Sequence, residues 1–177
     1  MTSRRFLILA ASFALAAWTT SAAAADMPAT ATEKSKAIIE AKSGSSVSGA
    51  AVATETKGAV EIVVDVAGAS AGVHAVHIHE KGDCSAPDAT SAGGHFNPTG
   101  EAHGAPDADH HHAGDFGNMT VGADGKGHLV ITSKMLTVAA GPNSVAGRAI
   151  IVHEKEDDMK TQPTGNAGGR IGCGVFK

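Results

Sequence analysis

The stretch Ala59-Val-Glu-Ile-Val-Val-Asp-Val66 decides the fold class of this chain. Its apolar and acidic residues partly alternate, as on a half-solvated strand of an antiparallel sheet. No segment of the sequence has sustained helical periodicity with caps. Seven other short segments have strand-like composition and are separated by turn residues: 36–42, 47–55, 73–80, 119–123, 128–132, 148–154 and 171–176. The sequence therefore predicts an all-β domain, an eight-stranded antiparallel sandwich or flattened barrel with Greek-key connections.

The first 25 residues have the composition of a secretory signal peptide. Arg4 and Arg5 precede an apolar run over 6–18, and three alanines at 23–25 fit a small-residue cleavage site. An uncleaved anchor is the alternative, and the paired arginines also give an imperfect match to a twin-arginine signal. We expect an exported protein, periplasmic as the first choice and secreted as the second.

Cleavage after residue 25 would leave 152 residues, enough for one domain. Residues 26–35 are mostly small or polar and are expected to form a flexible leader, followed by the folded domain over 36–177. The cleaved chain has 12 basic and 18 acidic side chains, a formal charge of −6. That charge and the absence of a basic run argue against nucleic-acid binding and against stable membrane association. A homodimer is compatible with the sequence but is not indicated by it.

Histidines form the most informative pattern of the chain. His77 and His79 flank Ile78, and residues two apart on a strand point to the same face, so these two rings can hold one ion. A pair of this kind also arises by chance on a solvated face. The other candidate ligands are His95, His103, His112, Asp115 and His153. Seven side chains exceed the needs of one four-coordinate ion, and imidazoles with one carboxylate suit zinc and copper. The pattern predicts two metal ions.

A 36-residue stretch from Lys81 to Phe116, rich in Gly, Asp, Pro and His, is too long to be an ordinary turn. Three of its imidazoles and one of its carboxylates, those of His95, His103, His112 and Asp115, match a closed, structural zinc site. The alternative is a His-rich loop that binds metal weakly. His110 and His111 precede His112, so the register of the ligand is ambiguous. In an exported chain the two cysteines, Cys84 and Cys173, indicate one disulfide, with two separate buried thiols as the alternative.

Several blocks together resemble the signature of the copper/zinc superoxide dismutase family, in its exported bacterial form. They follow the order and approximate spacing of that family from about residue 36 to the C-terminus. The blocks are Val76-His-Ile-His-Glu80, Gly82-Asp-Cys84, Gly94-His-Phe-Asn-Pro98, His112-Ala-Gly-Asp-Phe-Gly-Asn118, Val152-His-Glu-Lys155 and Gly165-Asn-Ala-Gly-Gly-Arg-Ile-Gly-Cys-Gly-Val175.

The resemblance implies dismutation of superoxide to oxygen and hydrogen peroxide, with copper as the redox ion and zinc as its structural partner. It implies copper ligands His77, His79, His95 and His153, and zinc ligands His95, His103, His112 and Asp115. It further implies that His95 bridges the metals and supplies a proton, that Asp157 links His77 to His103, that Arg170 stands beside the open copper position, and that Cys84 pairs with Cys173.

The chain departs from the eukaryotic form of that family between Asp158 and Gly165, where only six residues stand. Lys155 and Lys160 remain as basic candidates for steering the substrate. His74 is expected to pack and hydrogen-bond near the copper strand, and His128 to lie at the surface. The rival hypotheses are a non-catalytic periplasmic copper/zinc-binding protein and a purely structural sandwich domain.

Overall fold

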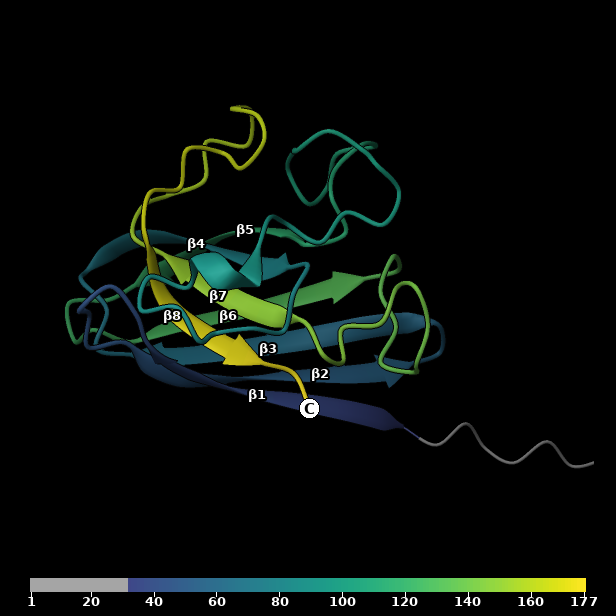
Figure 1. The fold of residues 1–177 in the computed structure, drawn as a ribbon, viewed down its shortest axis with the longest axis horizontal. Helices are drawn as coiled ribbons and strands as arrows, with labels where there is room; N and C mark the ends of the chain where they lie inside the picture. The colour runs from purple at the N-terminus through teal and green to yellow at the C-terminus, as the bar shows by residue number, and fades with distance from the viewer. Residues whose placement is uncertain (1–31) are drawn as a thin grey trace, which may run out of the picture.

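The computed structural model describes residues 32–177 (Figure 1). The predicted signal peptide and most of the predicted leader lie outside the described residues. Within residues 32–177 no helix has the length and apolar character that crossing a membrane requires. One 3-10 helix (Thr90–Ala92) accompanies eight strands: β1 (Glu33–Ala41), β2 (Ser48–Thr56), β3 (Ala59–Ala67), β4 (Gly72–His79), β5 (Asp115–Val121), β6 (Gly127–Ser133), β7 (Ala149–His153) and β8 (Arg170–Val175).

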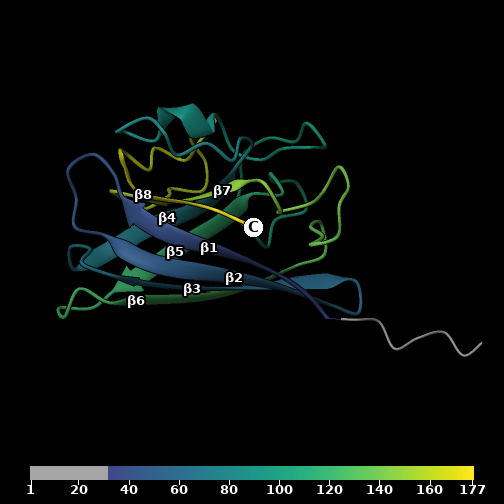
Figure 2. The same ribbon diagram turned by 60° about the horizontal axis from the view of Figure 1, so that its bottom comes forward.

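The eight strands form a closed antiparallel barrel in the order β1-β2-β3-β6-β5-β4-β7-β8. Figure 2 shows β1 crossing between β2 and β8, where pairing of Glu40 with Cys173 and of Ala41 with Gly172 closes the ring. Strands β4, β5 and β6 are sequential neighbours, and β3 returns beside β6, which is the Greek-key arrangement. The predicted eight-stranded antiparallel flattened barrel is confirmed.

Alternation along β3 shows how the barrel is stabilised. Val60, Ile62 and Val64 are fully buried in the core, whereas Glu61 and Asp65 face solvent. Each such aliphatic side chain contributes about 1.5–3 kcal/mol when it leaves water. The interior continues with other valines, isoleucines and alanines and is completed by Phe176 near the C-terminus.

Two strands begin several residues earlier than the sequence predicts. β5 starts at Asp115, inside the stretch predicted to be irregular, because Asp115 pairs with His77 of β4 across a bulge. Its glycine and polar residues concealed this pairing, which depends on a neighbouring strand. β1 starts at Glu33, so the last three residues of the predicted leader belong to a strand paired with β2.

Two long connections, which we call the first loop (80–114) and the second loop (154–169), lie on the same side of the barrel (Figure 1). The disulfide between Cys84 and Cys173 attaches the first loop to β8, with the two Cα atoms 5.9 Å apart. The predicted disulfide is therefore confirmed. Both loops can contribute side chains to one place beside β4 and β7.

Candidate metal centre

The first cluster of histidines is built on two paired strands. His77 and His79 lie on β4 with their rings on one face, and His153 lies at the end of β7, the strand that pairs with β4. His95 comes from the first loop, which is held against β4 by a bridge between His79 and His95. One ring nitrogen from each of the four histidines lies within 4.8 Å of the others, and all four residues are buried.

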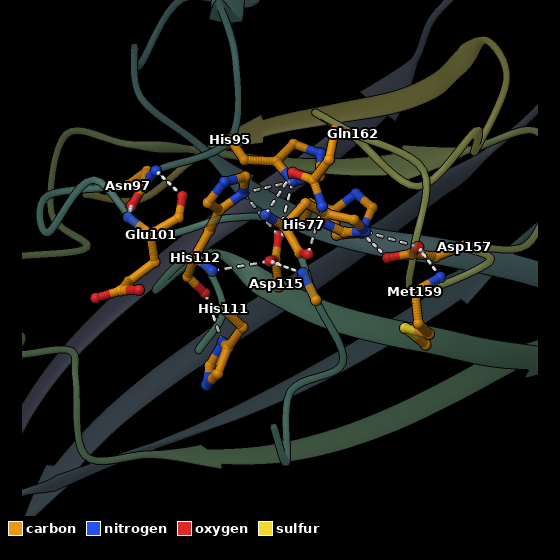
Figure 3. A network of polar contacts seen from close by, with 12 residues as sticks. His77, His95, Asn97, Glu101, His111, His112, Asp115, Asp157, Met159 and Gln162 are labelled. Carbon is orange, nitrogen blue, oxygen red and sulfur yellow. Dashed lines mark hydrogen bonds and ion pairs between the residues drawn. The ribbon is translucent and has the colours of Figure 1, made fainter. Parts of the chain in front are cut away.

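The second cluster gathers around one carboxylate at the start of β5 (Figure 3). Asp115 Oδ1 lies 2.7 Å from His95 Nδ1, 3.0 Å from His103 Nδ1 and 3.2 Å from His112 Nδ1. Its other oxygen, Oδ2, accepts hydrogen bonds from the backbone N–H groups of Gly104 at 3.1 Å and His112 at 2.9 Å. The carboxylate is thus fixed in direction while three ring nitrogens converge on one of its oxygens.

His95 belongs to both clusters. Its Nδ1 faces Asp115, and its Nε2 is buried without a hydrogen-bond partner in the described structure. The rings of His77 and His95 lie with their centroids 4.0 Å apart. One imidazole therefore presents one nitrogen to each cluster, which is the arrangement that would place two metal ions on either side of a single ring.

The buried nitrogens of the first cluster test whether metal ions fit. Leaving a buried polar nitrogen without a partner costs about 1–3 kcal/mol, and such groups are rare in folded proteins. Within residues 32–177, each histidine of this cluster has at least one: His77 Nδ1, His79 Nε2, His95 Nε2 and both ring nitrogens of His153. One nitrogen from each of the four rings lies close to the others, and such a group calls for a cation that accepts nitrogen ligands. The residues present therefore fit a metal ion of the copper or zinc type.

Asp157, in the second loop, connects the two clusters. Its Oδ2 lies 2.9 Å from His77 Nε2, and its Oδ1 lies 2.9 Å from His103 Nε2. Each of these rings is left with Nδ1 for metal binding, because the outer nitrogen is held by the carboxylate. His79 has the opposite orientation, with Nδ1 against the carbonyl oxygen of Gly93 at 2.9 Å and Nε2 directed inward. Partners of this kind fix the tautomer and the direction of a metal-binding ring.

Burial favours the neutral form of three rings of the first cluster. Desolvation lowers the pKa of His77 to about 4 and that of His79 to about 2, and it lowers the pKa of His153 well below the ordinary value. Neutral imidazole is the form that binds metal, so these rings are available far below neutral pH. Burial also disfavours the charged form of His103, but the hydrogen bond to Asp157 and the charge of Asp115 raise its pKa overall.

The two carboxylates remain ionised despite their surroundings. Burial alone would raise the pKa of Asp115, but hydrogen bonds from His95 and from backbone N–H groups lower it overall. For Asp157 the burial effect is likewise outweighed, chiefly by the hydrogen bond with His77, and its pKa falls to about 2. Each cluster therefore has an anionic oxygen beside its ring nitrogens, which suits a divalent cation.

Arg170 begins β8 and is held at the edge of the first cluster. Its Nη1 donates to the carbonyl oxygen of Ala89, and its Nη2 donates to that of Gly93, each at 2.7 Å. The same Gly93 carbonyl holds His79. Burial lowers the pKa of Arg170, and the nearby Asp88 raises it, but a guanidinium stays charged in proteins. The side chain is half-buried, so a fixed positive charge is available to a small anion.

The remaining histidines lie outside both clusters. His74 is buried, with Nδ1 2.8 Å from the carbonyl oxygen of His153, which agrees with the expected packing role. His110 is exposed and pairs with Glu101, while the ring of His111 turns toward the backbone carbonyl of His112. His128 is exposed and pairs with Asp65. The structure brings together every ligand candidate named from the sequence and leaves His110 and His111 aside.

Three residues that hold Asp157 and His103 in place were not identified from the sequence. Asn118 pairs with the backbone of Asp157, and Gln162 pairs with the backbone of His103. A Cβ at Gly165 would stand 1.8 Å from Asp157 Oδ1, and Gly165 also has a φ of +69°. Only glycine fits there. No local pattern marks these positions, because each acts on a residue remote in the sequence.

A closed antiparallel barrel with two histidine clusters that share one ring defines a class of dinuclear metal-binding proteins. The chain matches the family model of copper/zinc superoxide dismutase (SODC) over residues 47–176. It belongs to that family. A crystal structure of a protein described as the clock protein EA4 is similar, with 32% sequence identity and a TM-score of 0.74. The match covers 85% of this chain and 97% of that one.

Proposed function

We propose that this protein is a superoxide dismutase that holds copper in the first cluster and zinc in the second. The observation that carries the proposal is the ring of His95, with Nδ1 in the second cluster and an unpaired Nε2 in the first. The reaction converts two superoxide ions and two protons into oxygen and hydrogen peroxide. Copper would supply the one-electron chemistry, and zinc, which has no redox chemistry, would fix the geometry.

The protein contributes orientation, charge and a proton position. Asp157 and the Gly93 carbonyl hold His77 and His79 in the orientations that direct one nitrogen of each ring inward. His95 Nε2 is the atom at which a proton can be held beside the first cluster whenever that nitrogen is not a ligand. Because Nδ1 belongs to the second cluster, the ring would keep its direction while Nε2 takes up a proton and gives it to the product.

Arg170 is the residue proposed to bind the substrate. Its guanidinium is anchored to the carbonyls of Ala89 and Gly93, so it meets an incoming anion with little loss of side-chain entropy. A local positive charge is needed because the whole chain carries a formal charge of −4 and would repel superoxide. Arg170 thus draws the anion to the edge of the first cluster.

A non-catalytic metal-binding protein is the second candidate function. One solved structure similar to this chain is described as a clock protein, so the fold alone does not imply dismutation. Here both ligand groups are complete and Arg170 stands at the first of them. A protein that only stored metal would not need an anchored guanidinium at that position, and this favours the enzyme.

The test is a superoxide assay on protein loaded with copper and zinc. We expect rapid dismutation, and Arg170→Ile should lower the rate at least about tenfold while copper stays bound, since local charge alters association rates by 10–10³. Lys34→Ile, which removes one positive charge from the exposed face of β1, is the matched control and should change the rate little. Metal-loaded protein without activity would refute the proposal, and an unchanged rate in Arg170→Ile would remove Arg170 from the mechanism.

We also propose that the protein is exported and acts in a periplasm. The disulfide between Cys84 and Cys173 supports this, because such bonds persist in oxidising compartments. The N-terminal composition supports it as well. The expected mature N-terminus is Asp26, and mass spectrometry of protein recovered from the periplasm checks it. Recovery of the uncleaved chain from the cytoplasm would overturn the proposal.

A further inference from the structure

The second loop reaches the second cluster through the carboxamide of Gln162 (Figure 3). Gln162 Oε1 accepts a hydrogen bond from the backbone N–H of His103 at 2.9 Å, and Gln162 Nε2 donates to the backbone carbonyl of His103 at 2.8 Å. Nε2 also donates to the carbonyl oxygen of Lys160 at 3.3 Å. One side chain therefore satisfies both backbone polar groups of a residue 59 positions away and stays tied to its own loop.

His103 depends on such support because no strand holds its backbone. It lies in the irregular part of the first loop, yet it is only 4% exposed. Its ring is held by Asp157 at Nε2, and its Nδ1 lies 3.0 Å from Asp115 Oδ1. These contacts define where the ring must lie, but they do not restrict the main chain from which it projects. Gln162 supplies the restraint on that main chain.

Asp157, the other member of the Asp157–His103 contact, has its backbone held in the same way by a side-chain amide. Asn118 Nδ2 donates to the backbone carbonyl of Asp157 at 2.9 Å, and the backbone N–H of Asp157 donates to Asn118 Oδ1 at 2.7 Å. Both members of the carboxylate–imidazole pair thus have their backbones held by a side-chain amide. Because the same pair of amide–backbone hydrogen bonds occurs at both residues, we interpret the contact made by Gln162 as support for the metal centre.

We propose that Gln162 is a positioning residue of the second metal cluster, which holds the backbone of His103 so that the ring nitrogen Nδ1 faces the ion. The inference rests on the proposed function to the extent that the second cluster binds zinc. Gln162 touches neither the ion nor the substrate. It acts through His103, and its loss weakens zinc binding and changes the ligand geometry even though every ligand is still present.

The rival explanation is that Gln162 only keeps the second loop folded. Thr161 offers a matched control, because its Oγ1 donates to Asp158 Oδ2 at 2.6 Å within the same loop, with no side-chain hydrogen bond to the first loop. Thr161→Val removes that bond and leaves His103 untouched. A contribution to loop folding alone would make Thr161→Val and Gln162→Ala equivalent, whereas the proposed role separates them.

The experiment measures zinc affinity by chelator competition, and the visible absorption of cobalt(II) bound in place of zinc, in the full chain and three variants. Gln162→Ala removes all three side-chain hydrogen bonds, two of them to His103. Gln162→Glu keeps the shape and the acceptor but turns a carboxylate oxygen toward two carbonyl oxygens. We expect both variants to bind zinc at least about tenfold more weakly, as is typical when a partner of a metal ligand is lost, and to change the cobalt spectrum. Thr161→Val should stay within about twofold of the wild type in affinity.

Unchanged zinc affinity with an unchanged cobalt spectrum in Gln162→Ala would overturn the inference, and so would an equal loss of affinity in Thr161→Val. If Gln162→Ala does not fold, the isosteric Gln162→Glu decides by the same two measurements. Failure of the proposed function looks different, because the wild-type protein itself would then bind neither zinc nor cobalt at this cluster.

Discussion

The barrel and the two loops beside it are ordered by different forces. In the barrel, Val60, Ile62 and Val64 are buried by the alternation of one strand, and backbone pairing fixes their register. In the loops, four polar side chains are buried (His95, His103, His112 and Asp157), and the links are carboxylate–imidazole contacts, side-chain amides and one disulfide. The fold therefore needs only hydrophobic patterning, whereas the candidate centre needs specific polar partners that are far apart in the sequence.

The largest effect expected from this difference concerns the disulfide between loop and barrel. Replacing Cys84 and Cys173 together by serine releases a connection across a sequence separation of 89 residues. The chain-entropy model then predicts a loss of about 4–5 kcal/mol in the free energy of unfolding. Guanidinium unfolding of the two proteins measures the loss. A decrease below about 1 kcal/mol would show that polar contacts alone hold the first loop.

The next effect is the pH dependence of the metal-free protein. The pKa of His77 is about 4 and that of His79 about 2, against about 6.5 in an unfolded chain. As the pH falls from 6.5 toward 4, the unfolded chain therefore binds protons that the folded protein does not, and stability falls. The shift of His77 corresponds to roughly 3 kcal/mol. His103, whose pKa is raised, acts in the opposite sense but is one ring against four, because burial also lowers the pKa of His112 and His153.

Unfolding of the metal-free protein at pH 7.5 and 4.5 checks this dependence, and the metal-loaded protein is the comparison. Below pH 4 the lowered pKa of Asp157 adds a second loss, because its contribution is present above its unfolded value of about 3.9 and disappears as the pH falls toward 2. Equal stability at the two pH values would contradict the burial argument for the first cluster.

A smaller effect is expected from a substitution in the barrel core, which tests whether the core and the metal centre are independent. Ile62 is fully buried on β3, away from the ligands. Ile62→Val removes one methylene and should lower the free energy of unfolding by about 1 kcal/mol. Zinc and copper affinities should not change. Weaker metal binding in this variant would mean that the barrel interior and the loops are not independent.

The smallest effect is expected from the histidines beside the second cluster. Replacing His110 and His111 together by alanine should alter the free energy of unfolding by less than about 0.5 kcal/mol. His110 is exposed, and neither ring belongs to a ligand group. Zinc content, measured by elemental analysis, should be retained. Its loss would show that His112 is not the ligand of this stretch.

Much of this molecule could be predicted from local sequence. Alternation at 59–66 indicated a strand with the correct inward face, and the spacing of His77 and His79 placed both rings on one side of β4. The early start of β5 was missed because Asp115 is in a strand only through its pairing with β4. Gln162 was missed because its partner is 59 residues away, and no periodicity connects the two. Contacts that depend on how distant loops meet leave no local pattern.

The ring of His95 also has a thermodynamic consequence. Since its two nitrogens belong to different clusters, binding of an ion at one nitrogen restricts the ring for an ion at the other. Linkage then requires reciprocity: whatever factor zinc contributes to copper affinity, copper must contribute to zinc affinity. The order in which the ions arrive changes the route of assembly but leaves the total free energy of the filled centre the same.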